Sequence, residues 1–308
     1  MLSLIGELGI PLLLGLAYVW QVRRLEPKGR APSTARQVCF AAGLLVIAAT
    51  TAGPLGSLSE QRVSAHMVQH LLLMDLAGFL LVMGVTGPVL APVLGAPVLR
   101  HLRPLFHPAI ALAIFIGAFA IWHIPALYQA AAQNDAVHAA EHGLFLSSGV
   151  IKWMALIGPL PAPLWFATGV QIVYVAAEHL FVAVVGNVFM WSGTPIYSLY
   201  AERTSALGID PVTDQSIGGG FMAVWGMLLT LGLLAWVLLE WSKHDTERQE
   251  LLEFAERHGL AIDEDRVKRA VLAGHGEALR RRLREQAAVE PGARAEAGAA
   301  QLPVPGTG

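Results

Sequence analysis

The chain contains about seven apolar stretches that are long enough to cross a lipid bilayer, and these limit its possible folds more than any other feature. A membrane-spanning helix needs roughly 20 mostly apolar residues. The stretches are Leu2–Trp20, Gln37–Leu55, Ala65–Val85, Pro108–Ile124, Val137–Ile157, Leu164–Val188 and Gly219–Glu240. Only 14% of the 308 residues are charged, fewer than a soluble domain of this length carries. We therefore predict an all-α integral membrane protein, a bundle of about seven transmembrane helices.

The segment after residue 240 has a different character and is predicted to form a separate domain. It carries eleven of the 21 Lys and Arg residues. Charged residues alternate there with Leu251, Leu252, Phe254 and Leu260, which is typical of amphipathic helices, and a second helix is expected over 267–287. From Glu290 the composition favours disorder. The prediction is a transmembrane domain over 1–240 and a cytoplasmic, partly disordered helical tail over 241–308.

The distribution of Lys and Arg predicts the orientation in the membrane. Short cytoplasmic loops carry an excess of these residues. One set of loops holds Arg23, Arg24, Lys28, Arg30, Arg36, Arg100 and Arg103, with Lys152 near the end of the fifth span. The opposite loops hold Arg62, Arg203 and several acidic residues. We therefore expect the N-terminus outside and the basic tail in the cytoplasm.

Six histidines on four predicted spans are expected to lie at one depth, in the outer leaflet. They are His66, His70, His123, His138, His142 and His179. Ionisable side chains within spans are costly and usually line a functional interior. Converging imidazoles therefore indicate a metal or haem site.

The strongest ligand candidates share helical faces on the third and fifth spans. His66, His70 and Met74 are spaced i, i+4, i+8, and Met67 lies beside His70. His138 and His142 repeat the i, i+4 spacing. Imidazole suits several transition metals, whereas a thioether selects Cu(I), so the set favours copper. The alternative is a pair of interfacial histidines with ordinary core methionines.

Five further residues are candidates for supporting the metal or ligating it. Glu141 and Glu178 could accept the ring N–H of a ligating histidine, although Glu178 could equally form a structural Glu–His hydrogen bond. His179 follows Glu178, and His123 ends the fourth span, where it faces the site or the headgroups. Asp214 precedes the seventh span and either controls entry or caps a loop.

Several classes of function lack their sequence signals. The single cysteine, Cys39, excludes a CxxC metal site, and a net charge of −2 offers no basic surface for nucleic acid. The sequence contains no HExxH, GxSxG, P-loop, GxGxxG or CxxCH motif. A protein that is not an enzyme is therefore favoured.

In order along the chain, HMVQHLLL, WHIPALYQAA, HAAEHGLFLSSGVIKW, Tyr197 with Tyr200, and GIDPVTDQSIGGGFM resemble the CtaG family of cytochrome c oxidase assembly factors, the seven-span bacterial type. The resemblance covers roughly residues 40–240. It implies a bacterial plasma-membrane protein that is needed to assemble active haem–copper oxidase, through delivery of copper. The residues that stand in the matching motifs are His66, His70, His123, His138, Glu141, His142 and Asp214.

Three hypotheses for function remain open at this point. The first is a copper-handling assembly factor in the respiratory chain, which takes copper from an extracytoplasmic chaperone and passes it to an oxidase subunit. The second is a bis-His haem protein that transfers electrons. The third, and least favoured, is a membrane-embedded zinc hydrolase with two His and one Glu as ligands.

Overall fold

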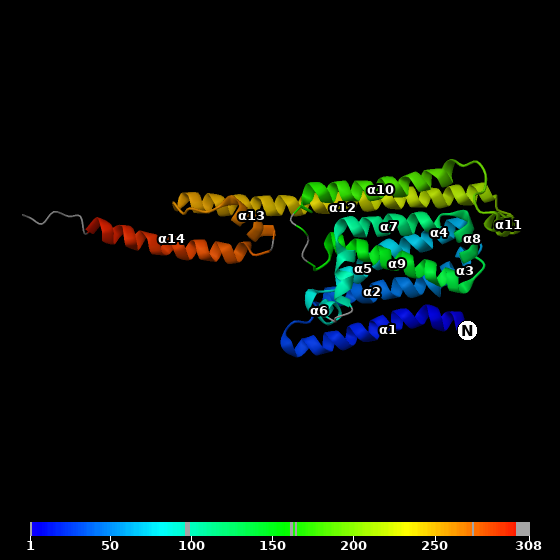
Figure 1. Cartoon of the computed structure of the whole chain (residues 1–308), viewed down its shortest axis with the longest axis horizontal. Coiled ribbons are helices and arrows are strands. Elements are labelled where there is room, and N and C mark those ends of the chain that lie inside the picture. Colours follow the sequence, from blue (N-terminus) through cyan, green and yellow to red (C-terminus); the bar gives the residue numbers. More distant parts are fainter. Residues whose placement is uncertain (1, 96–98, 161–162, 164, 273, 300–308) are drawn as a thin grey trace, which may run out of the picture. The chain divides into compact units, whose positions relative to one another are not determined.

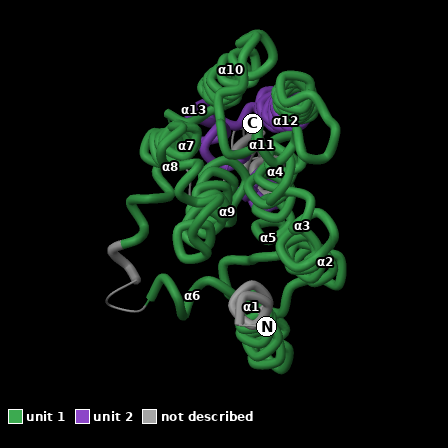
Figure 2. The backbone as a smooth tube through the Cα atoms, turned by 90° about the vertical axis from the view of Figure 1, so that its right-hand side faces the viewer, with its two compact units in different colours: residues 1–233 green, residues 234–308 purple. Residues whose placement is uncertain are grey.

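The protein is described from a computed structural model, which covers residues 2–95, 99–160, 163, 165–272 and 274–299. The regular structure of these residues is helical throughout, so the all-α prediction is confirmed over the described part of the chain. The chain divides into two compact units, residues 1–233 and 234–308 (Figure 2). The domain boundary predicted near residue 240 and the cytoplasmic place of the tail stay predictions.

The helices follow the predicted apolar stretches closely, with three main differences. The third stretch is built from three consecutive helical segments, and Leu164 at the start of the sixth stretch lies outside the described residues. The seventh helix, predicted over Gly219–Glu240, extends well beyond both ends, from Pro211 to Arg257. The first unit contains α1 (Leu2–Leu25), α2 (Thr34–Thr51), α3 (Pro54–Ser59), α4 (Val63–Leu71), the π-helix η2 (Leu72–Ala77), α5 (Gly78–Gly84), α6 (Gly87–Gly95), α7 (Pro108–Trp122), α8 (Pro125–Ala131), α9 (Asp135–Ile157), α10 (Thr168–Trp191), α11 (Ser198–Ala206) and the first part of α12 (Pro211–Arg257), with short 3₁₀ turns at Glu26–Lys28 and Leu99–Phe106 (Figure 1). The rest of α12, from Leu234, belongs to the second unit.

Four helical segments of the described chain are long and apolar enough to cross a membrane. These are α2, the continuous run α4–η2–α5, α10 and α12. A fifth is possible if α7 and α8, which meet at a bend of 79°, form one span. Helix α9 has spanning length, but Asp135, Glu141 and Lys152 make it more polar. The chain is thus a helical membrane protein with four to five candidate spans, and the count of seven stays a prediction.

The run α4–η2–α5 lies at the centre of the first unit. Two thirds of it (67%) is buried, against 22% of α2, 33% of α10 and 11% of α12. The run approaches α9 closely at Gly149, where there is no side chain. A Cβ atom on Gly149 would lie only 2.0 Å from the carbonyl oxygen of Met74 in η2. The π-helix therefore packs directly against the backbone of α9.

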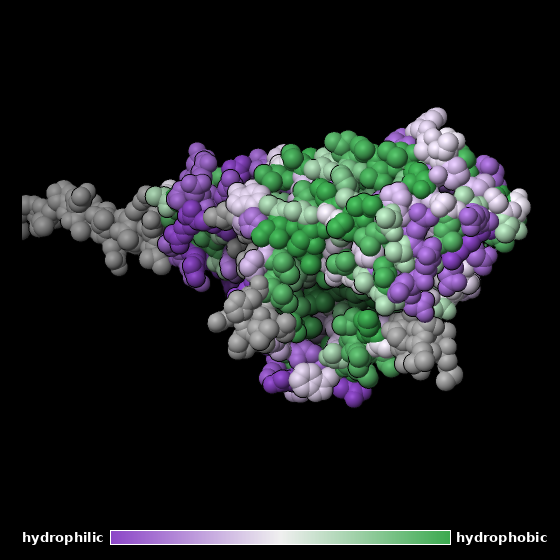
Figure 3. All heavy atoms as spheres, turned by 45° about the vertical axis from the view of Figure 1, so that its right-hand side comes forward, coloured by the Kyte–Doolittle hydropathy of each residue, from purple (hydrophilic) through white to green (hydrophobic). Residues whose placement is uncertain are grey.

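The outer helices present apolar side chains outward, as a lipid environment requires. Figure 3 shows hydrophobic surface over the helices of the bundle and hydrophilic surface at the end where α8 and α11 lie. The exposed apolar side chains of α10 and α12 include Val173, Leu180, Val184, Val188, Phe221, Val224, Leu228 and Leu231. This exposure is expected where lipid tails, rather than water, cover the protein.

The second unit has its own small core. Leu251 packs with residues of α13 (Glu264–Leu272) and α14 (Gly276–Ala299). One helix was expected over 267–287, but Gly274 adopts φ 69°, a left-handed conformation that glycine favours, and the chain forms two helices instead. Helix α14 continues through residues 290–299, where the composition predicts disorder. The Glu250 carboxylate accepts a 2.6 Å hydrogen bond from Arg280, and this bond raises the pKa of the Arg280 guanidinium.

Candidate metal centre

The helices α4 and α9 carry the paired histidines and run side by side in the same direction. The ring of His66 faces that of His138, and the ring of His70 faces that of His142 one turn further on, with centroids 5.8 and 5.6 Å apart. Within each helix the two rings lie 4.2 Å apart. The i, i+4 spacing therefore places four imidazoles in a buried cluster of two cross-helix pairs, as the sequence predicts.

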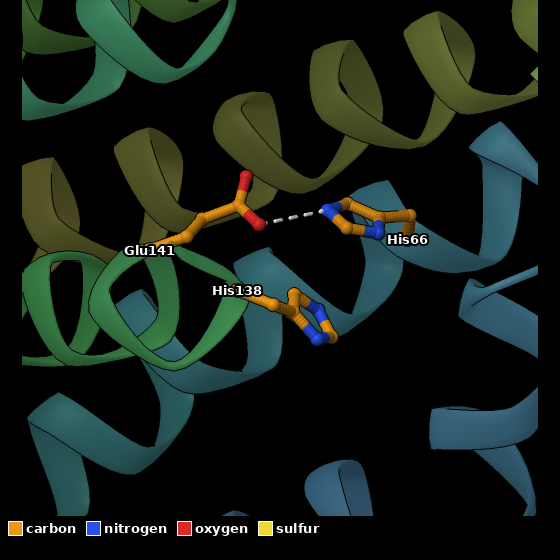
Figure 4. A group of neighbouring side chains, drawn as sticks. All are labelled: His66, His138 and Glu141. Atoms are coloured by element: carbon orange, nitrogen blue, oxygen red, sulfur yellow. Dashed lines mark ion pairs between the residues drawn. The ribbon is translucent and has the colours of Figure 1, made fainter. Parts of the chain in front are cut away.

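Glu141 lies between these two pairs and is completely buried. Its Oε2 atom is 3.6 Å from Nε2 of His66, and its Oε1 atom is 3.7 Å from Nε2 of His70. Two groups of three potential metal ligands result, each with its ligand atoms within 4.8 Å of one another: His66, His138 and Glu141 (Figure 4), and His70, Glu141 and His142. Glu141 is common to both groups.

Local caps position both helices. The side chain of Asn134 accepts hydrogen bonds from the backbone N–H groups of Ala136 and Val137, which begins α9 one turn before His138. At the start of α4, the Asp214 carboxylate accepts from the Arg62 side chain and from both the hydroxyl and the backbone N–H of Ser64. Asp214 thus holds α4 against α12 two residues before His66. Both oxygens of Asp214 accept hydrogen bonds from these donors, so in the structure its role is to fix the N-terminus of α4.

Tyr200 on α11 determines which nitrogen of His66 is available to a metal. The hydroxyl of Tyr200 donates its single hydrogen to the carbonyl oxygen of Ser59 at 2.9 Å and lies 3.0 Å from Nδ1 of His66. With that hydrogen on Ser59, the Nδ1–H of His66 donates to Tyr200, which leaves the lone pair of Nε2 free for a metal, 3.6 Å from Oε2 of Glu141. Burial raises the pKa of Tyr200, so its hydroxyl stays neutral. Sequence reasoning named Tyr200 only as a motif residue and missed this role.

Aromatic and thioether side chains enclose the cluster. Tyr128 and Tyr197 stack with ring centroids 3.8 Å apart, and Tyr128 lies 4.8 Å from His66. Phe145 covers His70 at 4.2 Å. Met67 and Met74 are each 1% exposed and belong to the same apolar core cluster. Copper ligation by Met67 and Met74 stays a prediction, and the two three-ligand groups described above consist of His and Glu.

The structure separates the other histidines from the two groups. Nδ1 of His123 lies 2.6 Å from the carbonyl oxygen of Phe119, and its ring stacks on that phenylalanine. The ring of Phe145 contacts both His123 and His70, with centroid distances of 6.5 and 4.2 Å. His179 on α10 faces α12, where its Nδ1 atom would lie 3.1 Å from a Cβ atom on Gly226. Neither residue belongs to a three-ligand group.

Glu178 belongs to a second buried cluster, built around Lys152. The ammonium group of Lys152 lies 2.5 Å from Asp75 and 2.7 Å from Glu178, and Asp75 also accepts from the indole N–H of Trp225. The sequence prediction placed Lys152 among the cytoplasmic basic residues, but its side chain is 0% exposed within α9. Lys152 is therefore not a loop residue, and it does not count in the distribution of Lys and Arg from which the orientation was predicted. Asp75 and Glu178 are acids on apolar spans and need a partner there. That need could have identified Lys152 as a buried residue from the sequence.

Sequence comparison assigns the family. Residues 16–244, about three quarters of the chain, match the family described as the cytochrome c oxidase caa3 assembly factor, Caa3_CtaG. The chain belongs to this family. The match includes both helices of the cluster and extends the resemblance of the sequence motifs towards the N-terminus.

Two curated relatives of this Caa3_CtaG chain come from mycobacteria. They are the uncharacterized proteins Mb0105 of Mycobacterium bovis and MT0111 of Mycobacterium tuberculosis, each 22% identical over 262 residues. The alignment covers 79% of this chain but only 39% of each relative, so the chain matches well under half of their length. No solved structure matches the chain significantly.

The ligand set of this Caa3_CtaG chain suits a transition-metal ion. The atoms Nε2 of His66, His70, His138 and His142 and both carboxylate oxygens of Glu141 are buried and have no hydrogen-bond partner in the described part of the chain. An unsatisfied buried polar atom costs roughly 1–3 kcal/mol, and metal binding would satisfy the atoms that act as ligands. Imidazole and carboxylate ligands suit copper, zinc and iron.

Proposed function

We propose that this membrane protein assists assembly of haem–copper cytochrome c oxidase by binding copper at the His–Glu cluster and passing it to an oxidase subunit. The observation that carries the proposal is the convergence of two buried and two half-buried imidazoles and one buried carboxylate, whose ligand atoms are free. Family membership suggests an oxidase subunit as the acceptor of the copper, because the family is described by its role in oxidase assembly. In this role the chain is a carrier rather than an enzyme, and an extracytoplasmic copper chaperone is the proposed donor.

The contacts within the cluster favour an ion over haem. The rings of His66 and His70 touch at 4.2 Å, and so do those of His138 and His142. Between the facing pairs the centroids are under 6 Å apart, with Glu141 filling the remaining space. A porphyrin ring does not fit between these helices without separating them. An absorption spectrum of the purified protein tests this, since bound haem gives a Soret band and Cu(I) is colourless.

A zinc hydrolase would use the same ligand types and would keep an open position for water. Copper is favoured here because the family serves an oxidase that contains copper. Metal analysis separates the two, and the copper proposal expects little zinc after purification in the presence of a mild chelator.

Delivery of copper to the oxidase predicts the behaviour of a double variant. His66→Ala with His70→Ala removes one ligand from each group, so we expect oxidase assembled beside it to lack most of its copper while its haem content falls less. The measurement is metal and haem per oxidase purified from cells that carry each variant. His179→Ala is the matched control, because it removes a half-buried imidazole that lies outside the two groups. Normal oxidase copper in the double variant would contradict delivery.

The proposed direction of transfer requires a particular topology. With the N-terminus outside and the tail in the cytoplasm, the N-terminal turns of α4 and α9 lie towards the outer surface, where extracytoplasmic copper arrives. The orientation rests on the basic first loop and tail. A reporter that is active only in the cytoplasm should be active when fused after Glu240. Activity instead from a fusion in the loop between α10 and α11 would reverse the orientation.

A further inference from the structure

We propose that the cluster binds two copper ions, bridged by the carboxylate of Glu141. This inference rests on the proposed copper-binding function and adds a second ion to it. The first position consists of His66, His138 and Oε2 of Glu141, and the second consists of His70, His142 and Oε1.

The two oxygens of Glu141 approach different histidines. Oε2 lies 3.6 Å from Nε2 of His66, and Oε1 lies 3.7 Å from Nε2 of His70. Two ligand atoms that bind one tetrahedral ion at about 2.0–2.2 Å lie roughly 3.3–3.6 Å apart. Each oxygen–nitrogen separation therefore suits an ion between its two atoms, and the two ions would share one carboxylate.

The parallel helices supply one complete set of ligands per turn. Each three-ligand group contains one histidine from α4, one from α9, and Glu141. Residues four apart on a helix are displaced by about 6 Å along its axis, and two-metal sites commonly hold their ions about 3.5–4 Å apart. The bridging carboxylate therefore implies an ion–ion distance of roughly 4–6 Å.

A single ion would leave half of the cluster unsatisfied. If one ion occupied the first position, the Nε2 atoms of His70 and His142 would stay buried without a partner, as they are among the described residues. In the described part of the chain the ligand atoms of the four histidines do not form one group within 4.8 Å, whereas each three-ligand group does. A second ion satisfies the remaining atoms with little rearrangement.

Charge favours two monovalent ions. Glu141 is the only acid in the two groups, and its side chain is 0% exposed. Two Cu(I) ions with this carboxylate carry a net charge of +1, the same as one Cu(II) ion, whereas two divalent ions carry +3. Buried net charge is costly, so the site accommodates a pair of Cu(I) ions as readily as one Cu(II).

Copper stoichiometry tests the second position. The purified full chain in detergent is loaded anaerobically with Cu(I), washed with a competing chelator, and analysed for copper per chain. We expect two equivalents in the native protein, about one in His138→Ala and about one in His142→Ala, and less than one in Glu141→Gln. His179→Ala should retain two.

A measurement on the native protein guards against variants that fail to fold. Anaerobic titration of the native protein with Cu(I), against a chelator of known affinity, should reach saturation at two equivalents per chain. Saturation at one equivalent overturns the two-ion inference and leaves the proposed function intact. No retained copper overturns both.

Discussion

Replacing Lys152 with methionine should destabilise the folded protein by about 3–5 kcal/mol. The native ammonium group lies within 2.7 Å of both Asp75 and Glu178, and its side chain is 0% exposed. Without it, two carboxylates face one another in an apolar interior with no cation to balance them. Removal of one partner from a buried ion pair costs far more than the intact pair contributes. The unfolding free energy in detergent, from denaturant titration, measures the loss.

Lys243→Met is the matched control, because its ammonium group is 73% exposed and lies 3.4 Å from Glu240. An exposed pair of this kind contributes about 0–1 kcal/mol. Lys152→Met combined with Asp75→Asn and Glu178→Gln should recover part of the stability, since no uncompensated charge remains. Equal stability of the two single lysine variants would contradict the buried network.

Gly149→Ala should abolish copper binding although it changes no ligand. A Cβ atom at this position would lie 2.0 Å from the carbonyl oxygen of Met74, and that atom belongs to the backbone of η2. Relief of the clash requires α9 to move away from the run α4–η2–α5, which separates the two histidines of each cross-helix pair. Overpacking of this kind typically costs about 1–3 kcal/mol, and more where backbone must shift. Copper per chain and thermal stability are the two measurements.

Gly143→Ala provides the control on the same helix. A Cβ atom there meets nothing within 4 Å, and alanine is a better helix former than glycine by up to about 1 kcal/mol. This variant should keep its copper and its stability. If Gly149→Ala also kept both, the close approach of the two helices would not position the site.

The sequence was sufficient to predict the helical class and the approximate positions of the long helices, but not the short helices between them. Apolar runs of about 20 residues leave few alternatives to helices, and Pro108 and Pro125 mark the starts of α7 and α8. The single long helix expected over 267–287 was wrong, because Gly274 breaks it. Such a break depends on one backbone dihedral angle, which periodicity does not report.

The i, i+4 spacing on α4 and α9, with Glu141 one residue before His142, was enough to select the four histidines and the carboxylate. Helical periodicity determines which side chains share a face, so these residues could be chosen from spacing alone. The direction in which a single polar side chain points could not be predicted from spacing. Glu178 and His179 are adjacent, yet one joins Lys152 and the other faces α12.

The sequence by itself determined that this chain is a helical membrane protein with stripes of imidazole, because hydrophobicity and helical period are local properties. Only the tertiary structure decided that α4 and α9 lie in parallel register, that Glu141 stands between the two pairs, and that Asp214 and Tyr200 hold His66 in position. These relations join residues about 70 to 150 positions apart. They depend on close packing at glycines such as Gly149 and on pairing of buried charges, and both are set by the whole bundle rather than by any one segment.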